Sequence, residues 1–485
     1  MFPFASWILT ACDQGLVGAT EPPPPSTTAS LVVTDGTAPA KLFADDVRIS
    51  KISIYQGVEV VLAEDGEAPS TFEAPVVAGR DALLRVFLAP DEAFEPRRLE
   101  VVLTIVNDEE TVLTARERIE RRSTDEDVTS TLNLDIAGDL LEEGTELVVE
   151  MLEVDQERPG TGDKDDVKWR SLAQGGLGAE ETDDLTIVLV PIRYNADGSG
   201  RLPDTSPAQV ARIEELVAGI YPARSVNVRV HPVVDWNLPV SPGNSNQWGN
   251  LLQAVNELRD SADESPNTYY YGMFNGEASI DAYCRFGCIL GLSLLAPPNG
   301  GPYFRASIGV GFSGQYSAET LVHEVGHAHG RDHAPCGLSD ADRQYPYAGA
   351  EIGSWGYDLV DGRFYDPDVY VDMMSYCSPI WVSDYTYFNL VERIQTVSRQ
   401  PRAMPASRQT VALAADGTTL RAGRMNVLPG VGAPVALDLY DADGRHAGVG
   451  AGSFFAYDHI EGGIVALDED LPEGWTAVAQ ALPAR

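Results

Sequence analysis

The sequence has few basic residues. Of its 485 residues, 34 are lysine or arginine and 73 are aspartate or glutamate, which gives a formal net charge of −39. The acidic residues are spread along the whole length and do not form one tail. Such a charge repels phosphate backbones and anionic lipid surfaces, so the composition argues against a nucleic-acid-binding protein. The acidity is most simply interpreted as a contribution to solubility in an extracellular or salty medium.

Long hydrophobic runs are also lacking. No stretch approaches the roughly 20 apolar residues that span a bilayer, so we expect the body of the protein to be soluble. The chain starts with a short apolar run, "MFPFASWILTAC", and its last four residues, Leu9 to Cys12, resemble a bacterial lipobox. This predicts lipidation of Cys12, with a leader and a proline-rich tether over residues 1–45. Another form of export and a chance match are the alternatives, because no basic residue precedes the run. We therefore expect an exported protein, either secreted or a cell-surface lipoprotein that touches the membrane only through this anchor.

Cysteine is scarce, with five residues in the chain. Apart from Cys12, all of them lie between residues 284 and 377. In an exported protein an even set of cysteines predicts disulfides, here two, with three pairings open. The spacing of Cys284 and Cys288 suits a local loop bridge, which would leave Cys336 to pair with Cys377. A zinc site of four thiolates is the competing interpretation, although no second close pair matches the first.

The chain is longer than one hydrophobic core usually organises, so we expect several domains. Residues 46–155 contain short alternating apolar runs separated by turn residues, a pattern typical of an antiparallel β-sandwich. Residues 156–184 are polar and predict a linker. Residues 401–485 return to short alternating runs and predict a small C-terminal β-domain.

Residues 185–400 have a different pattern, in which apolar runs alternate with helical periodicity. Strands are expected at residues 185–194, 226–232 and 268–274, and helices at residues 205–221 and 247–262. This order predicts a mixed α/β sheet in the region. The chain as a whole is therefore expected to be a multidomain α+β protein.

Histidine is scarce as well, yet four of the seven histidines lie in "LVHEVGHAHGRDH", residues 321–333. Each residue of a helix advances about 100°, so His323 and His327 share one face and can share one metal ion. Glu324 lies one step aside, where it can reach a water molecule on that ion without ligating it. His329 points elsewhere on the helix and is expected to be a packing or hydrogen-bonding residue.

A glycine after the helix would let a third histidine reach the same ion. Gly330 is expected to end the helix, because glycine adopts the left-handed conformation without steric cost. The resulting turn can bring His333 back to the metal. Three neutral imidazoles leave one position of a tetrahedral zinc open, which is typical of a catalytic zinc and not of a structural one. Histidines on a solvated helix are the alternative, which the rarity of the full pattern disfavours.

These residues fill the pattern H-E-x-x-H-x-x-G-x-x-H, which resembles the metzincin clan of zinc metalloendopeptidases. The resemblance implies that residues 185–400 form a mixed, twisted sheet with an active-site helix and hold one catalytic Zn²⁺. It makes His323, His327 and His333 the ligands and Glu324 the catalytic residue.

The clan also carries a methionine turn beneath the metal, and "DMMSYC", residues 372–377, resembles that turn. The resemblance gives Met374 as the turn methionine, with Met373 as the less favoured choice. Tyr376 matches the position from which some members bring a tyrosine hydroxyl toward zinc, and a packing role for Tyr376 stays open. The stretch "AGRDALLRVFL", residues 78–88, is similar to secreted bacterial mucin-degrading metalloproteases of the StcE type.

The resemblance implies a zinc-dependent endopeptidase in which Glu324 assists the attack of a zinc-bound water on a peptide carbonyl. The expected partner is a protein or glycoprotein substrate in an extended conformation, and we expect a monomeric enzyme. By analogy with the clan, residues 304–312 would form an edge strand that pairs with the substrate; an ordinary sheet strand is the alternative. A zinc hydrolase that is not a peptidase, and a surface adhesin with a vestigial metal site, remain as rival functions.

Overall fold

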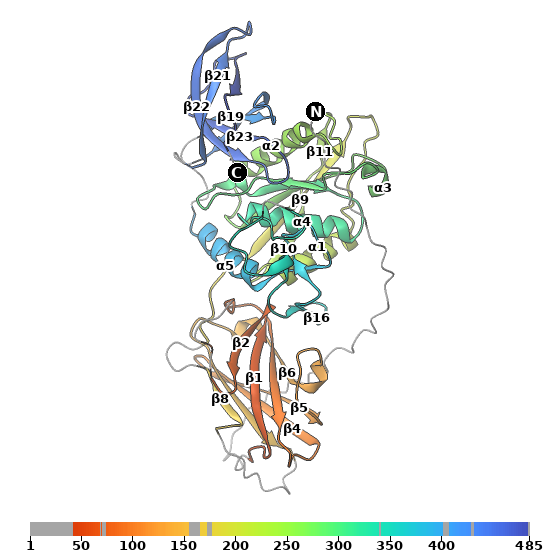
Figure 1. Cartoon of the computed structure of the whole chain (residues 1–485), viewed down its shortest axis with the longest axis vertical. Coiled ribbons are helices and arrows are strands. Elements are labelled where there is room, and N and C mark those ends of the chain that lie inside the picture. Colours follow the sequence, from red (N-terminus) through yellow and green to blue (C-terminus); the bar gives the residue numbers. More distant parts are fainter. Residues whose placement is uncertain are drawn as a thin grey trace.

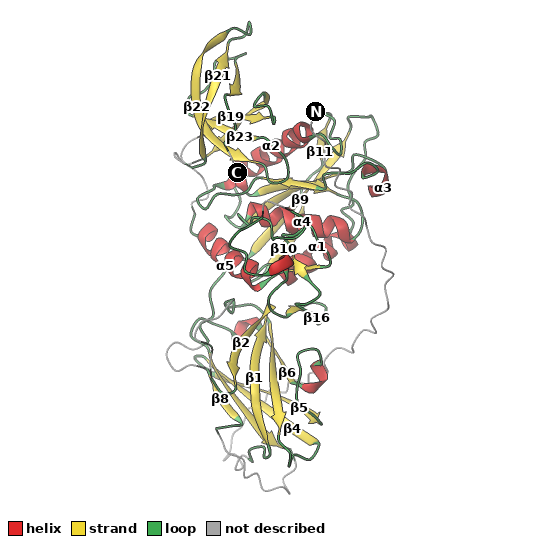
Figure 2. Cartoon of the chain, in the orientation of Figure 1, coloured by secondary structure: helices red, strands yellow, loops and turns green. Residues whose placement is uncertain are grey.

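The computed structural model describes residues 42–67, 69, 74–154, 165–171, 177–338, 341–400, 407–427 and 431–483. The predicted lipidation site Cys12 and the proline-rich tether lie outside these residues. Figure 1 shows an elongated molecule with β-sheets at both ends, and Figure 2 shows that the larger helices gather in the middle and beside the upper sheet. No helix within the described ranges is both long enough and apolar enough to cross a membrane. The protein is a mostly β, multidomain molecule with few helices.

Two sheets form the N-terminal part, at the bottom of Figure 1. Their strand orders are β16-β15-β2-β1-β3-β6 and β5-β4-β7-β8. The strands are β1 (Val47–Tyr55), β2 (Gly57–Glu64), β3 (Ala82–Pro90), β4 (Arg97–Val106), β5 (Glu110–Ile119), β6 (Leu132–Ile136), β7 (Glu146–Glu153), β8 (Lys168–Arg170), β15 (Gly356–Asp358) and β16 (Arg363–Tyr365). Every second residue of β4 is buried, so the period-two pattern of this strand reflects one apolar face. Because β15 pairs with β2, sheet hydrogen bonds cross the predicted domain boundary.

A third sheet lies in the middle of the molecule, with strand order β10-β9-β12-β14-β13 and β11 also paired with β9. Its strands are β9 (Leu185–Tyr194), β10 (Val226–Val230), β11 (Val234–Trp236), β12 (Thr268–Phe274), β13 (Gly291–Ser293) and β14 (Ala306–Val310). All neighbours are parallel except β13, which runs antiparallel to β14. The three strands predicted from the apolar runs are confirmed.

The expectation of an edge strand at residues 304–312 is wrong. β14 lies inside the sheet, paired with β12 on one side and with β13 on the other. All five residues of β14 are buried, as expected for an interior strand. The edge belongs to β13, whose three residues are too few to give an alternating pattern that could be read from sequence.

The helices are α1 (Pro207–Ile220), α2 (Ser245–Ser261), α3 (Ile280–Tyr283), α4 (Gln315–Ala328) and α5 (Asp384–Ser398), with short 3-10 turns at Val128–Ser130, Gly138–Leu140, Pro302–Phe304 and Ala348–Ala350. Both helices predicted between the strands are confirmed as α1 and α2. Ser206 caps α1 by accepting a hydrogen bond from the Gln209 amide, and Pro207 occupies the first turn. A small pair of parallel strands, β17 (Val371–Asp372) and β18 (Ile380–Trp381), precedes α5.

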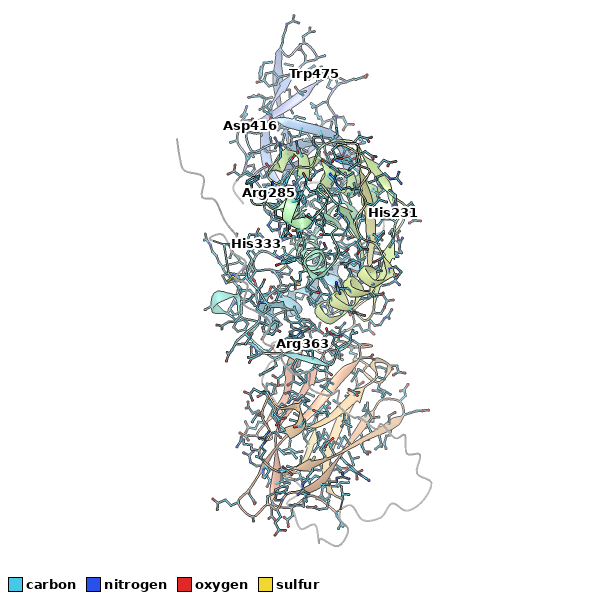
Figure 3. All side chains as sticks on the ribbon, turned by 90° about the vertical axis from the view of Figure 1, so that its right-hand side faces the viewer. His231, Arg285, His333, Arg363, Asp416 and Trp475 are labelled. Carbon is cyan, nitrogen blue, oxygen red and sulfur yellow. A yellow bond between two sulfur atoms is a disulfide. The ribbon has the colours of Figure 1, made fainter. Side chains whose placement is uncertain are left out.

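One sheet forms the C-terminal part, at the top of Figure 1, with strand order β20-β19-β23-β22-β21-β24. Its strands are β19 (Ser407–Leu413), β20 (Thr419–Asn426), β21 (Ala433–Tyr440), β22 (His446–Ala456), β23 (Gly463–Leu467) and β24 (Thr476–Ala479). β22 and β23 are paired, and the turn between them consists of residues 457–462. Figure 3 shows His333 in the middle of the molecule, between Arg363 of β16 below and Asp416 and Trp475 of the C-terminal part above.

Candidate metal centre

Helix α4 positions the first two histidines of the predicted site. His323 and His327 lie one turn apart on it, and both are buried, with 9% and 1% of their surface exposed. The helix begins after Gly314, whose φ of 109° a side chain would strain. It packs against β14 and β13, so the two imidazoles lie beside the antiparallel edge of the central sheet. Backbone geometry therefore brings the two histidines together, as their spacing predicts.

Gly330 turns the chain after the helix, as predicted. Its φ is 82°, and a Cβ atom there would lie 2.8 Å from the Ala296 carbonyl oxygen, so only glycine fits. The turn returns His333, and its Nε2 lies 3.2 Å from His327 Nε2. His323 Nε2 also lies 3.2 Å from His327 Nε2. Two nitrogens bound to one tetrahedral Zn²⁺ lie about 3.3 Å apart, since Zn–N bonds are about 2.0–2.1 Å. The structure thus brings the three predicted ligands to a spacing that suits zinc.

The other ring nitrogens show which atoms face the metal position. His323 Nδ1 donates to the Met373 carbonyl at 2.8 Å, and His327 Nδ1 donates to the Arg331 carbonyl at 2.7 Å. A neutral imidazole carries one hydrogen, so both Nε2 atoms are left as acceptors. Acceptors 3.2 Å apart repel each other unless a cation lies between them.

Burial keeps these rings neutral. It lowers the pKa of His323 to about 3, aided by the neighbouring His459, and it lowers the pKa of His327 well below the usual histidine range. Neutral rings with a fixed tautomer are the form that binds a metal. The donor set therefore fits a zinc ion held by His323, His327 and His333.

Glu324 lies beside the three histidines and is 1% exposed. Burial raises its pKa to about 8, although a hydrogen bond with Asp458 lowers it in part. The carboxylate fits there because residue 291 of β13 is glycine: a Cβ atom at Gly291 would lie 2.3 Å from Glu324 Oε1. A carboxyl group with a pKa near neutrality can both take and release a proton.

Met374 lies under α4, with 1% of its surface exposed. A Cβ atom at Gly326 would lie 2.3 Å from Met374 Sδ, so the glycine lets the thioether approach the helix between His323 and His327. The side chain of Met373 lies farther from this position, with its Cε 3.4 Å from the same point. The thioether of Met374 therefore packs against α4 at Gly326, and its role as the turn methionine stays a prediction.

Tyr376 is 40% exposed, and its ring centroid lies 5.1 Å from that of His333 and 5.9 Å from that of His323. Its hydroxyl forms a hydrogen bond with His459 Nδ1. Tyr376 is therefore next to the ligands, and in this structure it contacts a residue from the C-terminal part.

His329 is separated from the cluster, as its place on the helix predicts. It is 2% exposed and stacks on Tyr269, with ring centroids 4.0 Å apart. Its Nδ1 donates to the Val325 carbonyl at 2.8 Å.

Two disulfides are present, with the pairing favoured by the cysteine spacing. Cys284 is bonded to Cys288, and Cys336 is bonded to Cys377. The second bridge joins the segment after His333 to the end of the methionine turn, where the Tyr376 amide also donates to the Cys336 carbonyl at 3.1 Å. The interpretation of these cysteines as a thiolate zinc site is wrong.

Asp458 and His459, in the turn between β22 and β23, were not predicted as site residues. His459 forms one group with His323, His327 and His333, in which one ligand atom from each residue lies within 4.8 Å of the others. Its Nε2 also lies 2.9 Å from Glu324 Oε1. No spacing pattern links residue 459 to the helix motif, and the only sequence signal was that histidine is rare in this chain.

Comparison with protein families finds one match over this site. The family model Peptidase M66, which describes zinc metallopeptidases, matches residues 269–377. The matched segment runs from β12 to Cys377 and contains the three histidines, Glu324 and the methionine turn, but not Asp458 or His459. No curated protein matches the chain. The match and the histidine cluster together support a metallopeptidase.

Proposed function

We propose that this protein is an exported zinc-dependent endopeptidase of the metzincin type. The observation that carries the proposal is the convergence of three histidine Nε2 atoms, with Glu324 beside them. The Peptidase M66 match supports the reaction class. Two disulfides support an oxidising, extracytoplasmic location.

His323, His327 and His333 would hold the zinc ion through their Nε2 atoms. A bound zinc ion lowers the pKa of a water molecule and polarises a peptide carbonyl. Glu324 would take the proton from that water and pass it to the leaving amine. The hydrogen bonds from Nδ1 to the Met373 and Arg331 carbonyls keep two of the rings in the ligating orientation.

The edge of the central sheet supports a proposal for how a substrate binds. An extended peptide can pair with an exposed sheet edge through main-chain hydrogen bonds. β13 is the edge strand next to Glu324, so we propose that a protein or glycoprotein substrate binds there in an extended conformation, to a monomeric enzyme. The resemblance of residues 78–88 to mucin-degrading enzymes of the StcE type makes mucin-type glycoproteins a substrate to test.

The test is hydrolysis of casein, a mucin-type glycoprotein and a peptide library, with metal analysis of the same protein. We expect one zinc ion per chain, cleavage that stops with a chelator, and recovery when zinc is added back. Zinc without cleavage of any polypeptide, both by this chain and by a variant with an uncovered metal site, would contradict the proposal and favour an adhesin or a zinc hydrolase of another type. Cleavage that persists after complete zinc removal would also contradict it.

A further inference from the structure

The edge of the central sheet is already covered by the chain itself. Leu294, directly after β13, forms an antiparallel bridge with Tyr457. The Ser293 amide donates to both carboxylate oxygens of Asp458 at 3.1 Å, and the Asp458 amide donates to the Ser293 carbonyl at 3.3 Å. Residues 457 and 458 therefore lie along the edge where an extended substrate would pair.

The residue after Asp458 is His459, and its ring lies beside the three predicted ligands. The His459 ring centroid lies 5.2, 5.3 and 5.0 Å from those of His323, His327 and His333. A tetrahedral zinc with three histidines has one position left, and a fourth imidazole closes it. His459 also contacts the proposed base, since its Nε2 lies 2.9 Å from Glu324 Oε1. It thus lies beside the place that the water molecule and the substrate carbonyl would occupy.

Contacts outside the site hold the C-terminal sheet and its turn at residues 457–462 against helix α2. The Arg421 guanidinium lies 2.9 Å from the Glu257 carboxylate on α2, and the Asn426 amide donates to Asp260 at 2.8 Å. Gly249 of α2 makes room for Tyr457, because a Cβ atom at residue 249 would lie 2.7 Å from the tyrosine hydroxyl oxygen.

The buried side chain of Asp458 is a second sign that the turn is built for this place. Only 6% of Asp458 is exposed. Burying a carboxyl group is costly unless partners compensate for the lost water. Its partners are Ser293 of β13, Glu324, His459 and His327, whose Nε2 lies 3.5 Å from Asp458 Oδ2, and all of them belong to the site or border it. A hairpin turn that served only its own sheet would keep such a residue in solvent.

We propose that the turn at residues 457–462 is an intramolecular inhibitor, with His459 as the fourth zinc ligand and Asp458 holding the substrate's sheet edge. This inference rests on the proposed function and adds that the folded chain is a latent form of the enzyme. Displacing the turn would expose the open metal position, Glu324 and β13 together.

The experiment compares the full-length chain with its His459→Ala variant, and uses His446→Ala as the matched control. His446 lies on β22 of the same sheet, but its imidazole is 54% exposed and faces Asp438. Three properties are measured: zinc affinity by chelator competition, the visible spectrum of the cobalt-substituted protein, and binding of acetohydroxamate, which needs an open metal position. Peptide hydrolysis is measured alongside.

For His459→Ala we expect zinc binding about 10-fold weaker or more, a shifted cobalt spectrum, tighter acetohydroxamate binding and a higher kcat/KM. His446→Ala should match the wild type in all four. X-ray absorption at the zinc edge of the wild type needs no variant and should count four histidine ligands.

Three histidine ligands in the wild type would overturn the inference, and so would a His459→Ala variant with an unchanged cobalt spectrum and acetohydroxamate affinity. A variant that keeps zinc but loses turnover would also overturn it, because His459 would then assist catalysis. These results differ from failure of the proposed function, in which the wild type and the variant either both lack zinc or both bind zinc and cleave no polypeptide.

Discussion

The N-terminal and C-terminal sheets both dock on the central part of the molecule, but they bring different groups to it. At the N-terminal junction, Arg80 donates to the carbonyls of Tyr221 at 3.1 Å and Ala223 at 3.0 Å, and Trp381 donates to the Gly57 carbonyl at 2.7 Å. At the C-terminal junction, Asp458 and His459 enter the candidate metal centre. The N-terminal contacts satisfy backbone carbonyls and can only add stability, whereas the C-terminal contacts also touch chemically active groups.

This difference predicts separable effects. Changes at the N-terminal junction should alter the free energy of unfolding without altering the metal centre. Changes in the turn at residues 457–462 should alter the candidate metal centre. Changes in the contacts between the C-terminal sheet and α2 should have smaller, pH-dependent effects on stability.

The largest stability effect is expected for Arg80→Met. Arg80 is 5% exposed, and its loss would remove the donor from the Ala218 carbonyl of α1 and from the Ala223 carbonyl of the following turn. Each such group costs about 1–3 kcal/mol, so we expect about 2–4 kcal/mol less stability in urea unfolding. Zinc affinity should not change at temperatures where the protein is folded.

Arg98→Met is the matched control, because Arg98 lies on β4 with its side chain exposed. It should leave the unfolding curve close to that of the wild type. Loss of zinc affinity in folded Arg80→Met would contradict the proposed difference between the two junctions, because the N-terminal junction would then also affect the candidate metal centre.

A smaller effect on stability is expected for Asp260→Asn, which changes the contact between α2 and the C-terminal sheet. Burial raises the pKa of Asp260 to about 6, although its hydrogen bonds from Asn426 lower it in part. A carboxyl group with a raised pKa contributes stability below its unfolded pKa of about 3.9, and that contribution is lost as the pH rises through 6. The amide stays neutral, so the variant should be about 1–3 kcal/mol more stable than wild type at pH 7 and equal to it below pH 4.

Unfolding curves of the two proteins at both pH values measure this difference. Asp263→Asn, just beyond the same helix and exposed, should show no such pH-dependent gain. A difference in the free energy of unfolding that does not change with pH would contradict this prediction, because ionisation of Asp260 would then not be its cause.

Local sequence signals predicted much of the fold and most of the metal centre. The helical spacing of His323 and His327 and the turn at Gly330 are properties of a few adjacent residues, so they could be read directly. The apolar run at residues 185–194 and the cap at Ser206 are local in the same sense.

The features that could not be predicted from the sequence depend on contacts between residues that are far apart along the chain. β13 is a three-residue edge strand, defined by its partner β14 and not by its own pattern. His459 meets His323 only because a hairpin from a separate sheet docks on the site, and no local periodicity encodes such a contact. The pairing of β15 with β2 was missed for the same reason.

The most direct test of the account is zinc content and peptide hydrolysis of Glu324→Gln, measured on the same preparations. The variant should be made in the wild-type chain and in His459→Ala, so that a covered site cannot hide turnover. We predict one zinc ion per chain in every protein, and hydrolysis about 10²–10⁴-fold lower when Glu324 is replaced. A zinc-loaded Glu324→Gln protein that hydrolyses peptides as fast as its parent would contradict the account.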